Sequence, residues 1–131
     1  MGKFKVFFEE LQPAFVDEIV INLVPRKFSK DTDIIKIDHG AKYVYFITKG
    51  EVTICSTDAI EKYLKLGENS YFGEHLIFFN LKSSNAFRAV EGEVECMCIP
   101  KKKFQELCEE FPESAKILKT RAYLRRKHFR Q

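Results

Sequence analysis

The sequence predicts an α+β fold, in which an antiparallel sandwich or roll of short strands has helices before and after it. Three observations support this class. Apolar residues repeat every three to four positions at both ends of the chain, short runs rich in Val, Ile, Tyr and Phe fill the middle, and 131 residues suffice for only one ordinary domain. We therefore expect a single domain over 1–131, with helices in 1–24, strands in 26–100 and helices in 101–131.

Two amphipathic helices are predicted at the N-terminus. Apolar residues recur there at positions i, i+3, i+4 and i+7 in two successive stretches: Phe4, Phe7, Phe8 and Leu11, then Val16, Ile19, Val20 and Leu23. Pro25 is expected to end the second helix, because proline removes a helical hydrogen bond.

From Phe28 the pattern changes to short runs separated by glycines, with the spacing of an antiparallel sandwich or roll. The expected strands lie in 34–37, 43–48, 51–55, 63–66, 86–90 and 94–99. The segment EHLIFFNL after Gly73 interrupts the strands and predicts a short helix.

Helical spacing returns near the C-terminus, first with Phe104, Leu107, Cys108 and Phe111, and again after Pro112. In the last helix one stripe carries Leu118, Ala122, Arg125 and Phe129, so that an arginine lies on an apolar face. One explanation is that its alkyl stem packs on the core while the guanidinium reaches the rim.

Composition excludes several classes of protein. With 45% hydrophobic and 31% charged residues, the chain is neither collagen-like nor wholly disordered. It lacks an apolar run of the roughly 18 residues that a membrane-spanning helix needs, and its N-terminus does not resemble a signal peptide. We expect a cytoplasmic protein whose cysteines are reduced thiols: Cys55, Cys96, Cys98 and Cys108.

The net charge of +3 is concentrated at the C-terminus, where residues 116–131 hold seven Lys or Arg and no acid. Three interpretations of this segment remain open: a solvated or lid helix, a patch for membrane phosphoinositides, and a nucleic-acid arm. The first is preferred, so no nucleic-acid partner is expected.

Catalytic and metal chemistry have little support in the sequence. His39, His75 and His128 stand far apart, without an HxH, HExxH or CxxC partner. Cys96 and Cys98 would point to one face of a strand as two small buried thiols. We therefore expect neither an enzyme nor a bound metal or cofactor.

A ligand site is indicated where Ser70–Glu74 precedes the short helix. Gly73 would let backbone approach a ligand, and the N–H groups of Glu74, His75 and Leu76 would form a small anion site. The Glu74 carboxylate would accept hydrogen bonds from hydroxyls such as those of a ribose. Phosphate and sugar together indicate a nucleotide, whereas the alternative is a plain turn with an exposed glutamate.

These residues resemble a known family, the cyclic-nucleotide-binding domains, and most closely the versions in cyclic-nucleotide-gated, hyperpolarisation-activated and ether-a-go-go-type cation channels. The resemblance covers nearly the whole chain. It rests on Phe28, Ile34, Tyr45-Phe46-Ile47, Gly50, Leu66-Gly67, Tyr71-Phe72-Gly73-Glu74, Phe87-Arg88-Ala89 and the segment from Phe104 to Pro112. It implies an antiparallel β-roll, that is a double-stranded β-helix of jelly-roll type, flanked by N-terminal helices and by C-terminal B and C helices.

The resemblance also implies a ligand site for cAMP or cGMP around a phosphate-binding cassette at 72–84, which begins at Phe72 and ends at Ser84. Gly73, His75 and Leu76 would donate backbone N–H groups to the cyclic phosphate, and Glu74 would bind the ribose 2′-hydroxyl. Ile54 and Leu64 would pack on the purine, and Arg125 would face the base from the last helix.

One position departs from the family pattern. Nine residues after Glu74 the family places an arginine that pairs with the phosphate, and this chain has Ser83. Loss of such a pair costs roughly 2–3 kcal/mol, or about 30- to 150-fold in affinity, of which Lys82 would restore a part as a point charge. The ether-a-go-go-type relatives, which bind no nucleotide, also have polar residues here.

Two hypotheses follow. The first is a regulatory sensor that binds a cyclic nucleotide weakly and moves its last helix, which couples binding to an attached effector such as a cation channel. The second is a homology domain that binds no nucleotide and serves as a structural or interaction module, with its pocket filled by a side chain. In both, the chain contacts a membrane only through a parent protein.

Overall fold

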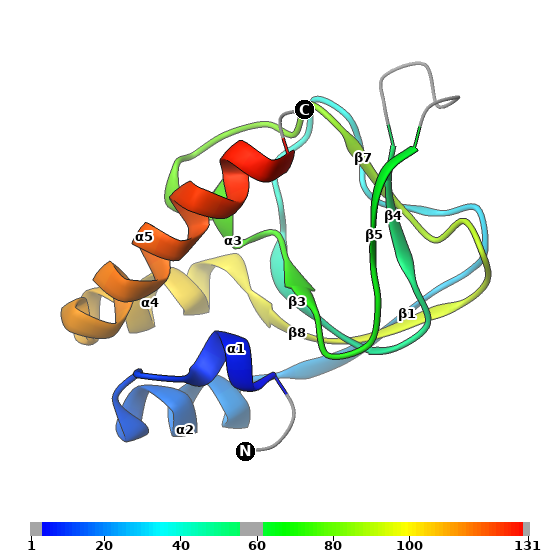
Figure 1. The fold of residues 1–131 in the computed structure, drawn as a ribbon. Helices are drawn as coiled ribbons and strands as arrows, with labels where there is room; N and C mark the ends of the chain where they lie inside the picture. Colours follow the sequence, from blue (N-terminus) through cyan, green and yellow to red (C-terminus); the bar gives the residue numbers. More distant parts are fainter. Residues whose placement is uncertain (1–3, 56–61, 130–131) are drawn as a thin grey trace.

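A computed structural model describes residues 4–55 and 62–129 and has two antiparallel sheets of four strands each, accompanied by helices (Figure 1). The first sheet has the order β1 (Val24–Phe28), β8 (Val94–Pro100), β3 (Tyr43–Lys49) and β6 (Tyr71–Phe72). The second has the order β2 (Asp33–Ile35), β7 (Ala86–Arg88), β4 (Val52–Cys55) and β5 (Lys62–Leu66). This arrangement confirms the predicted α+β class with a jelly-roll-like β-roll.

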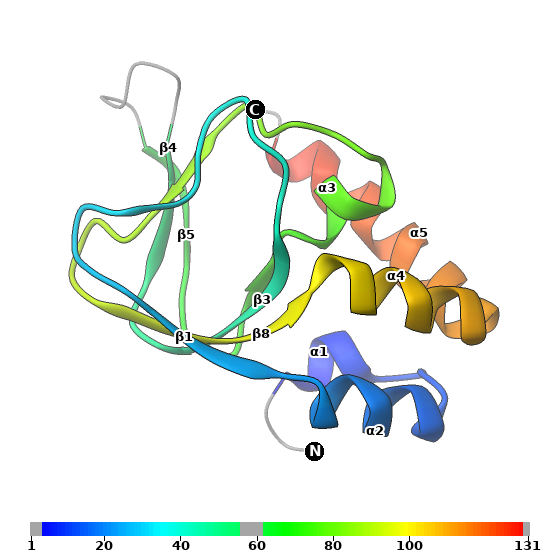
Figure 2. The ribbon, with the colours of Figure 1, turned by 180° about the vertical axis from the view of Figure 1, so that it is seen from behind.

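The helices are α1 (Lys5–Phe8), α2 (Pro13–Ile21), α3 (Glu74–Phe78), α4 (Lys101–Glu110) and α5 (Pro112–Phe129). Figures 1 and 2 show from opposite sides that the N-terminal and C-terminal helices gather beside the same end of the roll, away from the β4–β5 hairpin. The short helix α3 joins β6 to the segment before β7 and packs against α5. Helices α1 and α5 therefore lie beside β6 and α3, the segment predicted to bind a ligand.

The N-terminal expectations need two corrections. The first helix is a single turn, Lys5–Phe8, rather than a helix reaching Leu11, because the backbone at Glu10 turns to a positive φ of 68°. The second helix ends at Ile21, and Pro25 lies inside strand β1, which we did not predict. Four of the five β1 residues are exposed, so the strand lacks the alternation of buried and exposed residues that reveals strands in a sequence.

Pro25 is tolerated in β1 because this strand forms an edge of its sheet, where only one side pairs with a neighbour. Pro25 lies opposite Met97 of β8. Strand β6, of only two residues, was not among the expected strands either, and the others fall where the sequence predicted them, with their ends shifted by one or two residues. Of the expected helix after Gly73, the part Glu74–Phe78 is helical.

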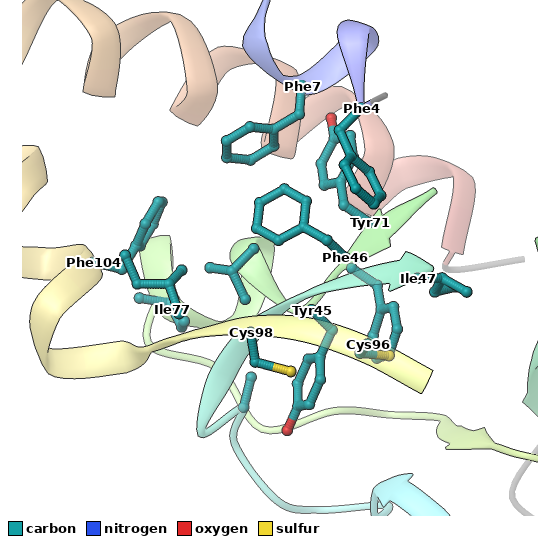
Figure 3. Packing of buried hydrophobic residues seen from close by; sticks show 14 of the residues in the cluster. Phe4, Phe7, Tyr45, Phe46, Ile47, Tyr71, Ile77, Cys96, Cys98 and Phe104 are labelled. Carbon is teal, nitrogen blue, oxygen red and sulfur yellow. The ribbon is translucent and has the colours of Figure 1, made fainter. Parts of the chain in front are cut away.

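The core is unusually aromatic, and Figure 3 shows its rings between the helices and the first sheet. Phe7 of α1 makes edge-to-face contacts with Phe46 of β3 and Tyr71 of β6, each with 4.8 Å between ring centroids. Such pairs contribute about 0.5–1.5 kcal/mol each beyond the burial of their area. They fix α1 against β6, the strand that leads directly into α3.

A second set of rings crosses the roll from one sheet to the other. Phe72 of β6 stacks on Tyr45 of β3 at 4.7 Å and on Phe87 of β7 at 5.1 Å, with nearly parallel rings. Successive residues of a strand point to opposite faces, so Tyr71 faces the helices while Phe72 enters the roll. The two neighbouring side chains thus hold β6 from both sides immediately before Gly73.

Candidate ligand site

The turn at Gly73 determines where the candidate site lies. Gly73 has a φ of +98°, which L side chains rarely adopt, and a Cβ placed there would come within 2.8 Å of the Tyr43 carbonyl oxygen. Only glycine fits this close approach of β6 to β3. The turn starts α3 at Glu74 and directs the Glu74 side chain into the protein, where the residue is 1% exposed.

The Glu74 carboxylate pairs with Arg125 of α5. The Arg125 Nη1 atom donates a hydrogen bond of 2.6 Å to Glu74 Oε2, and its Nη2 atom donates one of 2.7 Å to the Tyr71 carbonyl oxygen. The guanidinium carbon lies 4.0 Å from the centre of the Tyr71 ring. One arginine of the last helix therefore binds β6 and α3 together through an ion pair, a backbone hydrogen bond and a cation–π contact.

The second carboxylate oxygen, Glu74 Oε1, is buried and has no well-aligned hydrogen-bond donor among the described residues, although the nearby backbone N–H groups of Glu74 and His75 help to lower the pKa of the carboxyl. Burial raises the pKa of Glu74, and the adjacent Arg125 charge opposes that rise. A buried oxygen without a well-aligned donor is costly, so this atom is suited to accept a hydrogen bond from a group that enters the site.

His75, the next residue, has an opposite shift. Burial and then the charges of Arg125 and Arg126 lower the pKa of His75 from 6.5 to about 4. The imidazole is therefore neutral at pH 7. It adds no positive charge to the site at that pH.

A cavity of about 120 Å³ lies beside α3. It is lined by His75, Leu76, Leu81, Lys82, Ser83, Ser84, Asn85, Phe87 and Arg126. Ligand pockets commonly measure about 300–1,000 Å³, so a whole nucleotide exceeds this space. The cavity itself accommodates a smaller group.

Ser83 lines this cavity but uses its hydrogen-bond donors within the protein. It is 5% exposed, and its hydroxyl donates a hydrogen bond of 2.6 Å to the carbonyl oxygen of Asn85. Its backbone N–H donates to the His39 carbonyl oxygen, and its carbonyl accepts from the Asp38 N–H. These bonds join the end of the predicted cassette to the turn before β3, and they occupy the donors of Ser83.

Comparison with known proteins agrees with this geometry. Residues 25–111, about two thirds of the chain, match the family described as the cyclic nucleotide-binding domain. The chain belongs to this family. The site lies in the part that matches, except for the arginines of α5.

The curated relatives are channel proteins. The chain is 28% identical over 118 residues to the cyclic nucleotide-gated channel alpha-3 of Homo sapiens, which covers 85% of this chain and 17% of the channel. It is 26% identical over 121 residues to alpha-2 of Rattus norvegicus, covering 87% of this chain and 18% of that protein. With alpha-4 of Mus musculus the identity is 20% over 117 residues, with coverages of 85% and 20%. The chain thus spans a fifth or less of the length of these relatives.

The structure brings most of the predicted site residues of this cyclic nucleotide-binding domain together. Phe72 and Gly73 position α3, while His75, Leu76, Lys82, Ser83 and Ser84 line the cavity. The alternative of an exposed glutamate is wrong because Glu74 is buried. The expectation that the Arg125 guanidinium reaches only the rim is also wrong, because it pairs with Glu74.

Two predicted residues stand apart from this group. Ile54 of β4 is fully buried and lies opposite Leu64 of β5 in the second sheet. Neither residue lines a described cavity. Their contact with a purine therefore stays a prediction.

Sequence reasoning missed two arginines of α5. Arg126 lines the cavity beside Lys82, and Arg121 donates hydrogen bonds of 3.0–3.3 Å to the backbone carbonyls of Val6, Phe7 and Glu9. Arg121 precedes Arg125 by one helical turn, so helical spacing would have placed both on one face. For Arg126 no sequence signal distinguishes it from the other basic residues nearby.

The described residues show no helix with the length and apolarity that crossing a membrane requires.

Proposed function

We propose that this domain binds a cyclic nucleotide, cAMP or cGMP, with micromolar or weaker affinity, and that the ligand changes the position of α5. The observation that carries the proposal is the buried Glu74 carboxylate, which has one oxygen on Arg125 and the other without a well-aligned donor among the described residues. A ribose 2′-hydroxyl would donate to Glu74 Oε1. The backbone of Gly73, His75 and Leu76 would face the cyclic phosphate, as the family resemblance implies.

The burial of Glu74 supports a movement of α5. Glu74 is 1% exposed and Arg125 of α5 covers one of its carboxylate oxygens, so α5 would have to shift before a ribose reaches Glu74. A ligand shifts such an equilibrium only if it contacts α5 differently in the two positions. Arg125 provides this difference because it binds Glu74 directly and would lie beside the base.

The helix would pass its movement to the N-terminal segment. Arg121 of α5 binds the carbonyl groups at the end of α1, and α1 packs its Phe7 ring against Tyr71. Displacement of α5 would therefore loosen or reposition α1. We infer that an attached effector, such as a cation channel on the cytoplasmic side of a membrane, receives this change, and that the domain acts by binding and not by catalysis.

A second candidate function is that of a structural or interaction module without a nucleotide. Two observations favour it. Ser83 replaces the family's phosphate-binding arginine and uses its donors within the protein. Arg125 already occupies one oxygen of Glu74 and fills part of the site.

Calorimetry and thermal unfolding with cAMP and with cGMP distinguish the two functions. Binding stabilises the fold by RT ln(1 + [L]/Kd), about 2.7 kcal/mol when the ligand concentration is 100 times Kd. Glu74→Gln should weaken binding by about tenfold, since a neutral amide is a poorer acceptor than a carboxylate. Glu109→Gln on the exposed surface of α4 is the matched control and should leave affinity unchanged.

Hydrogen exchange tests the movement of α5 in the same samples. Ligand should change the protection of amides in 116–129 while the strands stay as they were. If neither nucleotide raises the melting temperature at concentrations up to about 10 mM, nucleotide binding is refuted and the interaction module remains. Binding without any change in those amides would refute the mobile α5.

A further inference from the structure

Helix α5 presents two successive arginines to different parts of the α3 segment. Arg125 binds Glu74 at the start of α3. Arg126 lies with its guanidinium carbon 6.0 Å from the centre of the Phe79 ring, just after α3, and lines the cavity of about 120 Å³. Neighbouring residues of an α-helix point about 100° apart, so the two side chains reach different ends of α3.

Positive charge borders the cavity, but it does not come from position 83, where the family pattern places an arginine. The hydroxyl and N–H of Ser83 already donate to Asn85 and His39 carbonyl oxygens. His75 is neutral at pH 7 because burial lowers its pKa to about 4. Among the described residues that line the cavity, Lys82 and Arg126 remain as the cations at that pH.

The size of the cavity suits a phosphate group. Its volume of about 120 Å³ is roughly four times the 30 Å³ that a water molecule occupies in the liquid. A phosphate group of five heavy atoms therefore fits, while the ribose and base must lie outside this space. Lys82 and Arg126 border the cavity from two different elements, the segment after α3 and helix α5.

We propose that Arg126, assisted by Lys82, is the phosphate-binding arginine of this domain and replaces, from helix α5, the charge that Ser83 lacks. The inference rests on the proposed function, because it concerns the phosphate of the same ligand. A guanidinium forms two parallel hydrogen bonds to phosphate oxygens, whereas a lysine contributes a point charge. The anionic group of the nucleotide would thus contact α5 itself.

This assignment changes which interaction would determine the position of helix α5. In the family pattern the phosphate-binding arginine lies between α3 and β7, outside the last helix. With Arg126 in that role, the phosphate attracts α5 directly, and both affinity and ordering of α5 depend on the same ion pair. Because Arg126 is partly exposed, its ion pair with the phosphate should weaken at high ionic strength.

Calorimetric titration of cAMP and cGMP into four proteins tests the proposal: the unsubstituted chain, Arg126→Gln, Lys119→Gln, and Arg126→Gln combined with Ser83→Arg. Lys119 is a matched control because its ammonium lies 6.0 Å from the same Phe79 ring on the same helix, but it does not line the cavity. We expect Arg126→Gln to weaken binding by about tenfold and Lys119→Gln to change it less than twofold. Ser83→Arg should restore the affinity lost in Arg126→Gln, because a guanidinium at position 83 would supply the two phosphate hydrogen bonds in place of Arg126.

The outcomes separate this inference from the function on which it rests. No binding to the unsubstituted chain overturns the proposed function and the inference together. Binding that is equal in the unsubstituted chain and Arg126→Gln overturns the inference alone. A loss in Arg126→Gln that Ser83→Arg fails to restore assigns Arg126 to the packing of α5, and this also overturns a phosphate-binding role.

Discussion

Arg125→Ala should destabilise the domain in a pH-dependent manner, because it leaves the Glu74 carboxylate buried without its cation. Glu74 is 1% exposed, whereas the Arg125 side chain is 24% exposed. Burial already raises the pKa of Glu74, and Arg125 is the main influence that lowers it. In the variant the pKa of Glu74 in the folded state should therefore rise further.

The magnitude follows from the ion pair and the additional hydrogen bond. An opposite charge in contact shifts a carboxyl pKa by about 1–3 units, and each unit corresponds to about 1.4 kcal/mol. Solvent reaches part of Arg125, so we take the lower part of this range, about 1–2 kcal/mol. The lost hydrogen bond to the Tyr71 carbonyl adds about 1 kcal/mol. We expect a loss of about 2–3 kcal/mol in the free energy of unfolding at pH 7.

The pH dependence has a definite sign. Between the ordinary and the raised pKa, the unfolded chain has released the Glu74 proton that the folded chain retains, so folded stability falls as pH rises. This fall extends further in the variant because its Glu74 pKa is higher. Near pH 4 the difference between the two proteins should be only the loss of about 1 kcal/mol from the Tyr71 contact, and it should grow toward neutral pH, with the unsubstituted chain the more stable.

Urea unfolding between pH 4 and pH 8 measures this difference. Lys119→Ala is the control for loss of a positive charge from α5. Glu74→Gln combined with Arg125→Ala should be less stable than Glu74→Gln alone by about 1 kcal/mol at every pH, from the Tyr71 contact. Equal unfolding energies for the parent and Arg125→Ala at pH 7 would refute the reasoning, and so would a loss that does not vary with pH. The same variant should bind cyclic nucleotide about fivefold more weakly, or about 1 kcal/mol.

Three other perturbations have defined outcomes. Ser83→Arg should tighten cyclic nucleotide binding by about tenfold or more, since its guanidinium would donate two charge-assisted hydrogen bonds to phosphate at the cavity. Equal affinities of the two proteins in calorimetry would show that the anion is held elsewhere or does not enter. The pKa of His75 falls to about 4 on folding, so as pH falls from about 6.5 to 4 only the unfolded chain binds a proton there, and the unsubstituted domain loses up to roughly 3 kcal/mol of stability. His75→Gln should remove this loss and flatten the dependence of the unfolding free energy on pH in that range. An unchanged dependence would contradict the shift. Arg121→Ala should loosen α1, with faster hydrogen exchange in residues 4–11 and a loss of about 1–3 kcal/mol in the free energy of unfolding. Lys119→Ala should leave the exchange and the stability as in the unsubstituted chain. Unchanged exchange in Arg121→Ala would mean that α1 is held by its phenylalanines alone.

The sequence by itself determined the order of elements and the segment that carries the site. The change from helical spacing to short β-rich runs after Phe28, and back again at Phe104, is a local pattern that needs no knowledge of the tertiary fold. The turn at Gly73 and the short helix after it were predicted on the same basis. Strand β1 was missed because it lies at a sheet edge and most of its residues are exposed, so it has no apolar alternation to detect.

Only the tertiary structure decided what the charged residues of the site contact. Arg125 and Glu74 are 51 residues apart, and Arg121 lies 112 residues from the Glu9 carbonyl that it binds. These pairings depend on where α5 crosses α3 and α1. That crossing results from the burial of side chains such as Leu118 and Ala122 on a helix that packs against α3 and α4, and neither spacing nor composition within any one segment encodes it. The pairing of Ser83 with Asn85 and the place of Arg126 at the cavity were decided in the same way, because a hydrogen bond or ion pair depends on distances in space that a sequence does not contain.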